Sequence, residues 1–191
     1  SAQWEFSVHV PGREARFDIL ASADDGKPDI GPYIEHAMQH DGDAARGQQL
    51  FQDLKGLACA KCHAIGGDAK AVLAGPDLAG IGAKYDRREI IRSVLEPSNR
   101  LLSGYELTIV ATADGEVLQG VVKSDTAEQL ELVDINGKVI RLTPDEIDER
   151  TRSELSLMPT GMFEGITVEE FADLLAYLQS LREVKAVEPQ P

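Results

Sequence analysis

The sequence predicts an α+β fold, in which a mainly α domain is interrupted by an antiparallel β-meander and preceded by a β-hairpin. Apolar residues recur at helical spacing in three segments, near residues 44–54, 86–95 and 167–181. Between the second and third segments, apolar and polar residues alternate with period two, as in half-buried strands. A chain of 191 residues is long enough to form one or two modest hydrophobic cores.

These patterns divide the chain into four expected parts. The parts are an N-terminal β-hairpin and linker at residues 1–35, the mainly α domain at 36–103 and 151–184, the inserted β-meander at 104–150, and a flexible tail at 185–191. An isolated hairpin is marginally stable in water, so we expect the N-terminal one to pack against the rest of the protein. Its first strand is predicted by apolar residues that point to one side, namely Trp4, Phe6, Val8 and Val10.

Helix signals support the mainly α domain. Asp43 is a suitable N-cap for the first helix of this domain, and Gly56 is a suitable stop. The middle helix spans residues 86–95 and ends before Pro97. Residues 167–170 read Thr-Val-Glu-Glu, a capping box that begins a third helix with one apolar stripe.

The β-meander is predicted from four alternating runs at residues 105–111, 116–123, 129–134 and 138–142. Asp114-Gly115 and Asn136-Gly137 are tight-turn signals between neighbouring strands. Such sheets often bind other chains, but nothing in these strands converges as a catalytic cluster. We therefore expect a self-contained sheet that covers one flank of a functional site.

The run Cys59-Ala60-Lys61-Cys62-His63 has the spacing C-x-x-C-H, at which two thiols bond a haem covalently and the following histidine ligates its iron. A structural zinc site normally needs four ligands, and the chain offers only His9, His36 and His40 besides this run, all upstream. A redox dithiol would follow a strand, whereas a predicted helix precedes this pair. The motif thus predicts a c-type cytochrome with one haem c, and a redox dithiol is the second reading.

Around the motif, the order of helix, C-x-x-C-H, Gly75-Pro76-Asp77-Leu78, a sulfur ligand and a C-terminal helix resembles the cytochrome c family. More narrowly, the segments CAKCHAIGG, AGPDLAGIGAKYDRREIIRSVLEPS and SLMPTGM resemble the Pirellula/Verrucomicrobium-type haem-binding domain, over about residues 44 to 183. The resemblance implies a cytochrome c-like haem domain. It also implies thioethers at Cys59 and Cys62, His63 as the proximal ligand, and a backbone carbonyl of Pro76 that accepts the His63 ring N–H.

The sixth iron ligand has several candidates. Met158 lies in an extended stretch before the last helix, where the resemblance places the axial thioether, and Met162 is the alternative. Met38 lies before the first helix of the haem domain, where no ligand is expected. A histidine or an open site completes the alternatives. Lys61, Arg87, Arg88, Arg92 and Arg100 are candidates to offset haem propionates.

Composition limits the function further. A net charge of −14 argues against binding nucleic acid or anionic lipid, and favours a partner with a basic docking patch. No stretch approaches the roughly twenty apolar residues of a membrane span, and no signal peptide is recognisable. Because the family attaches haem outside the cytoplasm, the resemblance implies a soluble periplasmic protein in mature or trimmed form.

We therefore expect a periplasmic one-electron carrier that is not an enzyme and serves, or is fused to, a dehydrogenase or a terminal acceptor. His63 and Met158 would complete the ligand set of the iron, and no acid, base or nucleophile constellation stands beside it. Two alternatives remain open. One is a gas-binding or peroxide-reducing haem protein with a displaceable sixth ligand, and the other is a protein- or glycan-binding module with a structural haem.

Overall fold

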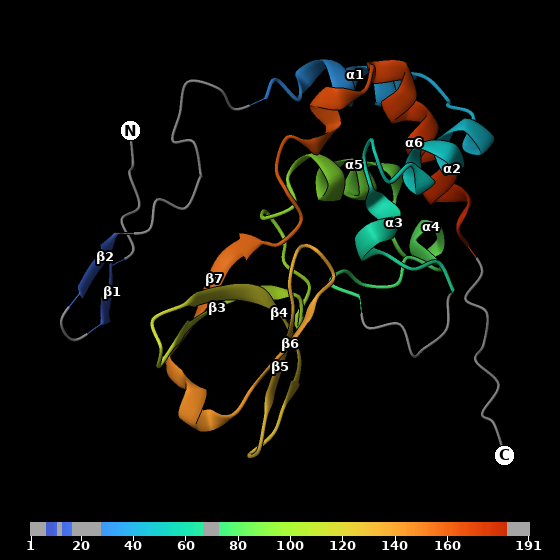
Figure 1. The fold of residues 1–191 in the computed structure, drawn as a ribbon. Coiled ribbons are helices and arrows are strands. Elements are labelled where there is room, and N and C mark those ends of the chain that lie inside the picture. Colours follow the sequence, from blue (N-terminus) through green and yellow to red (C-terminus); the bar gives the residue numbers. More distant parts are fainter. Residues whose placement is uncertain (1–6, 11–12, 17–27, 67–72, 183–191) are drawn as a thin grey trace, which may run out of the picture.

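The computed structural model describes residues 7–10, 13–16, 28–66 and 73–182 (Figure 1). Strands β1 (Ser7–Val10) and β2 (Arg13–Arg16) pair antiparallel and form the predicted N-terminal hairpin. The expected strand residues Trp4 and Phe6, the turn and the C-terminal tail lie outside the described residues. No helix of the described segments combines the length and the apolar character that crossing a bilayer demands.

The helical unit is built around the last helix. Its members are α1 (Gly31–Gln39), α2 (Ala44–Gln52), α3 (Cys59–Cys62), α4 (Ile81–Lys84), α5 (Arg87–Leu95) and α6 (Val168–Ser180). Helices α1, α2, α4 and α5 all contact α6. One face of α6 is fully covered, because Phe171, Leu174, Leu175 and Leu178 are each at most 4% exposed.

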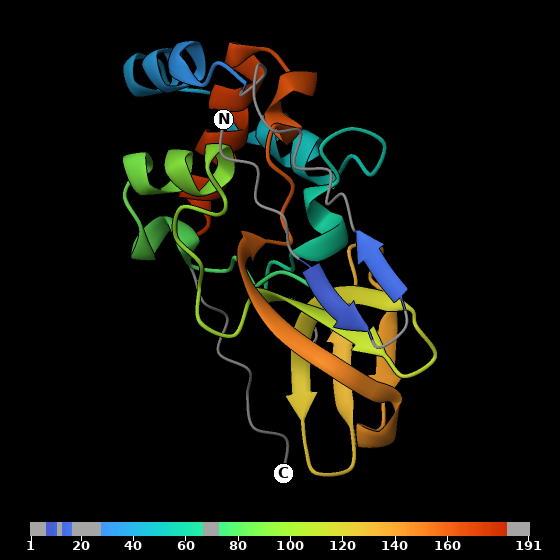
Figure 2. The same ribbon diagram turned by 90° about the vertical axis from the view of Figure 1, so that its left-hand side faces the viewer.

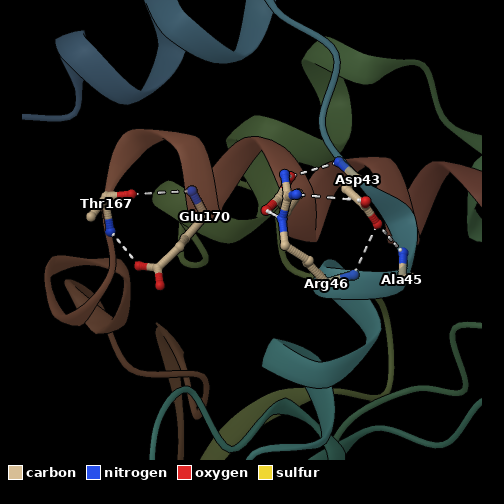
Figure 3. A network of polar contacts seen from close by, with 6 residues as sticks. Asp43, Ala45, Arg46, Thr167 and Glu170 are labelled. Carbon is tan, nitrogen blue, oxygen red and sulfur yellow. Dashed lines mark hydrogen bonds and ion pairs between the residues drawn. The ribbon is translucent and has the colours of Figure 1, made fainter.

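Capping side chains set where these helices begin. The Asp43 carboxylate accepts hydrogen bonds from the backbone N–H groups of Ala45 and Arg46, at 2.8 and 3.1 Å. Thr167 and Glu170 form a reciprocal capping box at the start of α6 (Figure 3). Asp86 and Glu89 form another at the start of α5. The sequence predicted the caps at Asp43 and Thr167, because capping is a local signal. It predicted the helix at residues 86–95 without its capping box.

Five strands form an antiparallel sheet in the order β6-β5-β4-β3-β7. They are β3 (Glu106–Thr112), β4 (Val117–Asp125), β5 (Leu130–Val133), β6 (Val139–Leu142) and β7 (Ile147–Ser156). The sheet curves around its own core, whose buried members are Val110, Leu130, Leu132 and Leu142. A short 3-10 helix, η1 (Pro144–Glu146), turns the chain between β6 and β7.

The expectation of a mainly α domain that carries the β-meander as an insertion is wrong. The described residues contain six α-helices and a five-stranded sheet with a hydrophobic core of its own, so neither class dominates. The missed element is β7, which continues the meander by pairing with β3. Its sequence, Ile147 to Ser156, is highly charged and no residue in it is fully buried, so it shows no apolar alternation. Backbone hydrogen bonds to β3 hold it in place, and these leave no sequence signal.

The sheet lies beside the end of the helical unit that carries α3, as both views show (Figures 1 and 2). The Lys61 ammonium in α3 donates a hydrogen bond to Asn136 Oδ1 in the β5–β6 turn, at 3.3 Å. At the C-terminal end of β7, the Ser156 N–H donates a hydrogen bond to Ser98 Oγ, at 3.0 Å. Ser98 lies in the segment that follows α5. The insertion is therefore joined to the helical unit next to the C-x-x-C-H motif and again just before Met158.

Candidate haem-attachment site

A tight turn delivers the chain into the motif. Asp53 ends α2, and its backbone carbonyl accepts the N–H groups of Gly56 and Ala58 at 3.3 and 3.0 Å. Ala58 then adopts a left-handed conformation with φ of 53°, which costs a residue with a Cβ roughly 1 kcal/mol. This reversal starts α3, where Cys59 and Cys62 lie one helical turn apart and both side chains are partly exposed.

The His63 ring is held by the loop that follows the motif. Its Nδ1 lies 2.9 Å from the Pro76 carbonyl oxygen, so this nitrogen carries the proton and donates it. The loop runs alongside the motif, because the Gly75 N–H donates to Cys62 O at 2.9 Å and the Leu78 N–H donates to Ala64 O at 2.8 Å. The second nitrogen, Nε2, consequently keeps a free lone pair for a metal.

Gly75 is required by the closeness of this packing. A Cβ at Gly75 would lie 2.6 Å from His63 Cε1 and 2.7 Å from Nδ1. No other residue type fits without moving the imidazole, since real Cβ atoms do not approach that closely. The first glycine of this loop is therefore in contact with the histidine ring.

Burial controls the protonation of all three motif side chains. Desolvation lowers the pKa of His63, with the Pro76 hydrogen bond opposing it, so the imidazole is neutral at pH 7. Burial raises the pKa of the Cys59 thiol to about 11 and also raises that of Cys62. Both thiols are therefore protonated at neutral pH. A reactive dithiol needs a depressed thiol pKa, so this environment disfavours the redox-dithiol reading.

The zinc reading finds no support in the described part of the chain, where no three His, Cys, Asp or Glu side chains are grouped to hold a metal ion. His36 lies on α1 and His40 is its C-cap residue, and their rings stack with centroids 4.2 Å apart. The side chain of His9 is outside the described residues. A donor set of two neutral thiols and one neutral imidazole fits covalent haem attachment better than tetrahedral zinc.

The candidate sixth ligands lie on the segment that joins β7 to α6. Met158 and Met162 are both half-buried there, and Met38 is 40% exposed on α1. The Met158 N–H donates to Ser156 Oγ at 3.1 Å, and Met162 begins the short 3-10 helix η2 (Met162–Gly165). A sulfur ligand from either position would come from the chain immediately before α6.

The sequence did not predict the contacts of three supporting side chains, those of Arg46, Asp173 and Arg87. The Arg46 guanidinium donates to both carboxylate oxygens of the buried Asp173, joining α2 to α6 (Figure 3). Arg87, one of the five candidates to offset haem propionates, donates to the carbonyls of Ala37 and His40 and to the Gln179 side chain. These contacts join residues between 47 and 127 positions apart, so no local pattern could reveal them.

Taken together, a neutral histidine oriented by a carbonyl, two adjacent thiols and a helical core packed on the last helix define a haem-binding electron-transfer protein. The cytochrome c family model matches residues 44–182, which include the motif, the sheet and α6. The chain belongs to the cytochrome c family. Membership implies covalently bound haem c, and Cys59, Cys62 and His63 fit that group by donor type and by the free Nε2. None of the curated proteins compared with the chain gives a significant match.

Proposed function

We propose that this protein is a periplasmic one-electron carrier with a single haem c, attached through Cys59 and Cys62 and ligated by His63 and Met158. One observation carries the proposal. The His63 imidazole is half-buried, neutral and fixed by Pro76, so that Nε2 is the only ring nitrogen available to iron. When bound, haem c supplies an iron that alternates between ferrous and ferric states, and thioether ligation raises its reduction potential.

The protein's own residues hold this centre rigid. The Pro76 carbonyl fixes both the tautomer and the ring orientation of His63, and Gly75 packs against the ring's edge. Rigid ligands reduce the structural change that accompanies each change of charge, which favours fast electron exchange. The sequence offers no acid, base or nucleophile constellation beside the motif, so we propose electron transfer without substrate turnover.

The surface charge supports a partner of opposite sign. The net charge of −14 favours a basic docking patch on a dehydrogenase or a terminal acceptor, and screening by salt should slow the encounter. We place the protein in the periplasm because covalent haem attachment of this type occurs there. The three segments quoted above support assignment to the Pirellula/Verrucomicrobium-type haem-binding subgroup.

Spectra of methionine variants test the proposal. The ferric wild type should show the weak near-infrared band of methionine-bound haem, and the ferrous form should show a c-type α-band and should not bind carbon monoxide. Met158→Ala should abolish the near-infrared band, lower the midpoint potential and admit carbon monoxide. Met162→Ala should keep the wild-type spectrum.

Met38→Ala is the matched control, because Met38 lies exposed on α1. Loss of the band in Met162→Ala but not in Met158→Ala would transfer the ligand role to Met162. A wild type that lacks the band and binds carbon monoxide would point to a gas-binding or peroxide-reducing protein instead. Cys59→Ser with Cys62→Ser should leave no haem covalently attached.

A further inference from the structure

Helix α1 lies outside the segment that matches the cytochrome c family, yet it packs against α6 and against the chain that precedes α6. Its Tyr33 ring meets Phe163 edge-on, with centroids 4.9 Å apart, and Phe171 with centroids 5.6 Å apart. The Tyr33 hydroxyl donates a hydrogen bond to the Ile166 carbonyl at 2.8 Å. One side chain thus contacts η2, the residue after it and the first turn of α6.

Further contacts fix α1 itself. A Cβ at Gly161 would lie 3.2 Å from Pro28 Cγ, so the chain before α1 runs close to the start of η2. At the other end of α1, Arg87 donates to the Ala37 and His40 carbonyls at 2.5 and 2.7 Å. These bonds satisfy carbonyls that the helix end leaves without partners. Arg87 belongs to α5. Both ends of α1 are therefore in contact with other parts of the helical unit.

The segment that carries both candidate methionines is therefore held at two points. At its beginning, Ser156 pairs with Glu106 of β3, and its N–H donates to Ser98 Oγ. At its end, the Ile166 carbonyl accepts from Tyr33. Between Ser156 and Ile166, a local movement would have to break one of these anchors or bend the chain between them.

We propose that Tyr33 is a positioning residue for the sixth ligand, acting through the Ile166 carbonyl and the Phe163 ring. This inference rests on the proposed methionine ligation and holds for Met158 or Met162, because both lie inside the held segment. Loss of the hydroxyl frees the end of the segment and increases the population in which the thioether has left the iron. A net hydrogen bond corresponds to roughly a three- to tenfold change in such an equilibrium.

The test compares the haem-loaded wild type with Tyr33→Phe, which keeps both aromatic contacts and removes only the hydroxyl. Titration of the ferric protein with imidazole measures how readily the methionine is displaced. Tyr33→Phe should bind imidazole about three- to tenfold more tightly and should show a weaker near-infrared band. Hydrogen exchange of the amides in residues 159–166 should be faster.

Tyr85→Phe is the matched control, because the Tyr85 ring contacts the cationic groups of Lys84 and Arg100 and lies in another part of the unit. It should keep wild-type imidazole affinity. If Tyr33→Phe lowers only the melting temperature and leaves the band and the imidazole affinity unchanged, Tyr33 is structural and the inference is overturned. A wild type without the near-infrared band overturns the methionine ligation and this inference together, so the wild-type spectrum separates the two failures.

Discussion

Gly47 in α2 lies directly against the backbone of Asp173 in α6: a Cβ at Gly47 would stand 2.0 Å from the Asp173 carbonyl oxygen and 2.8 Å from Tyr177 Cβ. Next to this contact, the Phe51 and Tyr177 rings meet edge-on with centroids 5.6 Å apart. Two other glycines, Gly42 and Gly82, meet the backbone of α6 equally closely. The last helix is therefore approached by bare backbone at three places.

Gly47→Ala should be strongly destabilising, because its Cβ would meet backbone that cannot rotate away. We expect the free energy of unfolding to fall by about 2–4 kcal/mol, measured by denaturant titration of the haem-loaded protein. Gly165→Ala is the control, since a Cβ at Gly165 meets nothing within 4 Å. Equal stability of the two variants would show that α2 and α6 can separate at little cost.

Asp173→Asn should destabilise the same crossing. The Asp173 side chain accepts from Arg46 Nε at 2.6 Å and from the Asp43 N–H at 2.6 Å, and the residue is only 4% exposed. An amide in its place keeps one acceptor and turns an N–H donor toward Arg46. We expect the free energy of unfolding to fall by about 3 kcal/mol. The measurement is denaturant unfolding at pH 7, with the exposed Asp148→Asn as control. A cost no larger than that of the control would mean that water replaces the lost bonds.

The same carboxylate predicts a pH dependence. Hydrogen bonds from Arg46, and then from the Asp43 N–H, hold the pKa of Asp173 below its ordinary value, although desolvation opposes them. As the pH falls, Asp173 therefore binds a proton at a higher pH in the unfolded chain than in the folded protein. The stability that Asp173 contributes is complete above the unfolded pKa of about 4, and is lost as the pH drops through the folded pKa. Asp173→Asn should lose less stability than the wild type between pH 5 and the acid limit of folding, by calorimetry.

The parts of the structure that the sequence predicted are those with local signals. The caps Asp43 and Thr167 predicted the starts of two helices, and the alternation in residues 105–142 predicted four strands. Strand β7 was missed because its charged side chains carry no apolar pattern. Without β7, the number of strands in the sheet and the relative amounts of helix and strand could not be inferred from the sequence.

For the site, the motif itself supplied Cys59, Cys62 and His63, but their protonation depends on burial, which no motif encodes. The contacts of Tyr33 and Arg87 depend on how α1 docks on a unit far away in the sequence. Such contacts can be found only once the packing is known. Which methionine ligates the iron stays a prediction.

Gly75→Ala should disturb the proximal side of the haem. The added Cβ overlaps the His63 ring, so the imidazole must tilt or the loop must move away from its Pro76 contact. We expect a lower yield of haem-loaded protein and a broader, shifted Soret band. Gly165→Ala again provides the control. If Gly75→Ala has the wild-type spectrum and the wild-type amount of haem-loaded protein, the loop can shift without moving the histidine.

Leu132→Ala should separate the stability of the sheet from that of the haem unit. Leu132 is completely buried in the core of the sheet, and this core shares no residue with the buried cluster around α6. Removing its side chain should cost the sheet about 3 kcal/mol. If the insertion unfolds as its own unit, amides of β4 and β5 will exchange faster while the haem spectrum stays that of the wild type. Leu102→Ala, at a residue 44% exposed, should change neither. Loss of the methionine band in Leu132→Ala would instead show that the sheet, which ends two residues before Met158, is energetically part of the haem site.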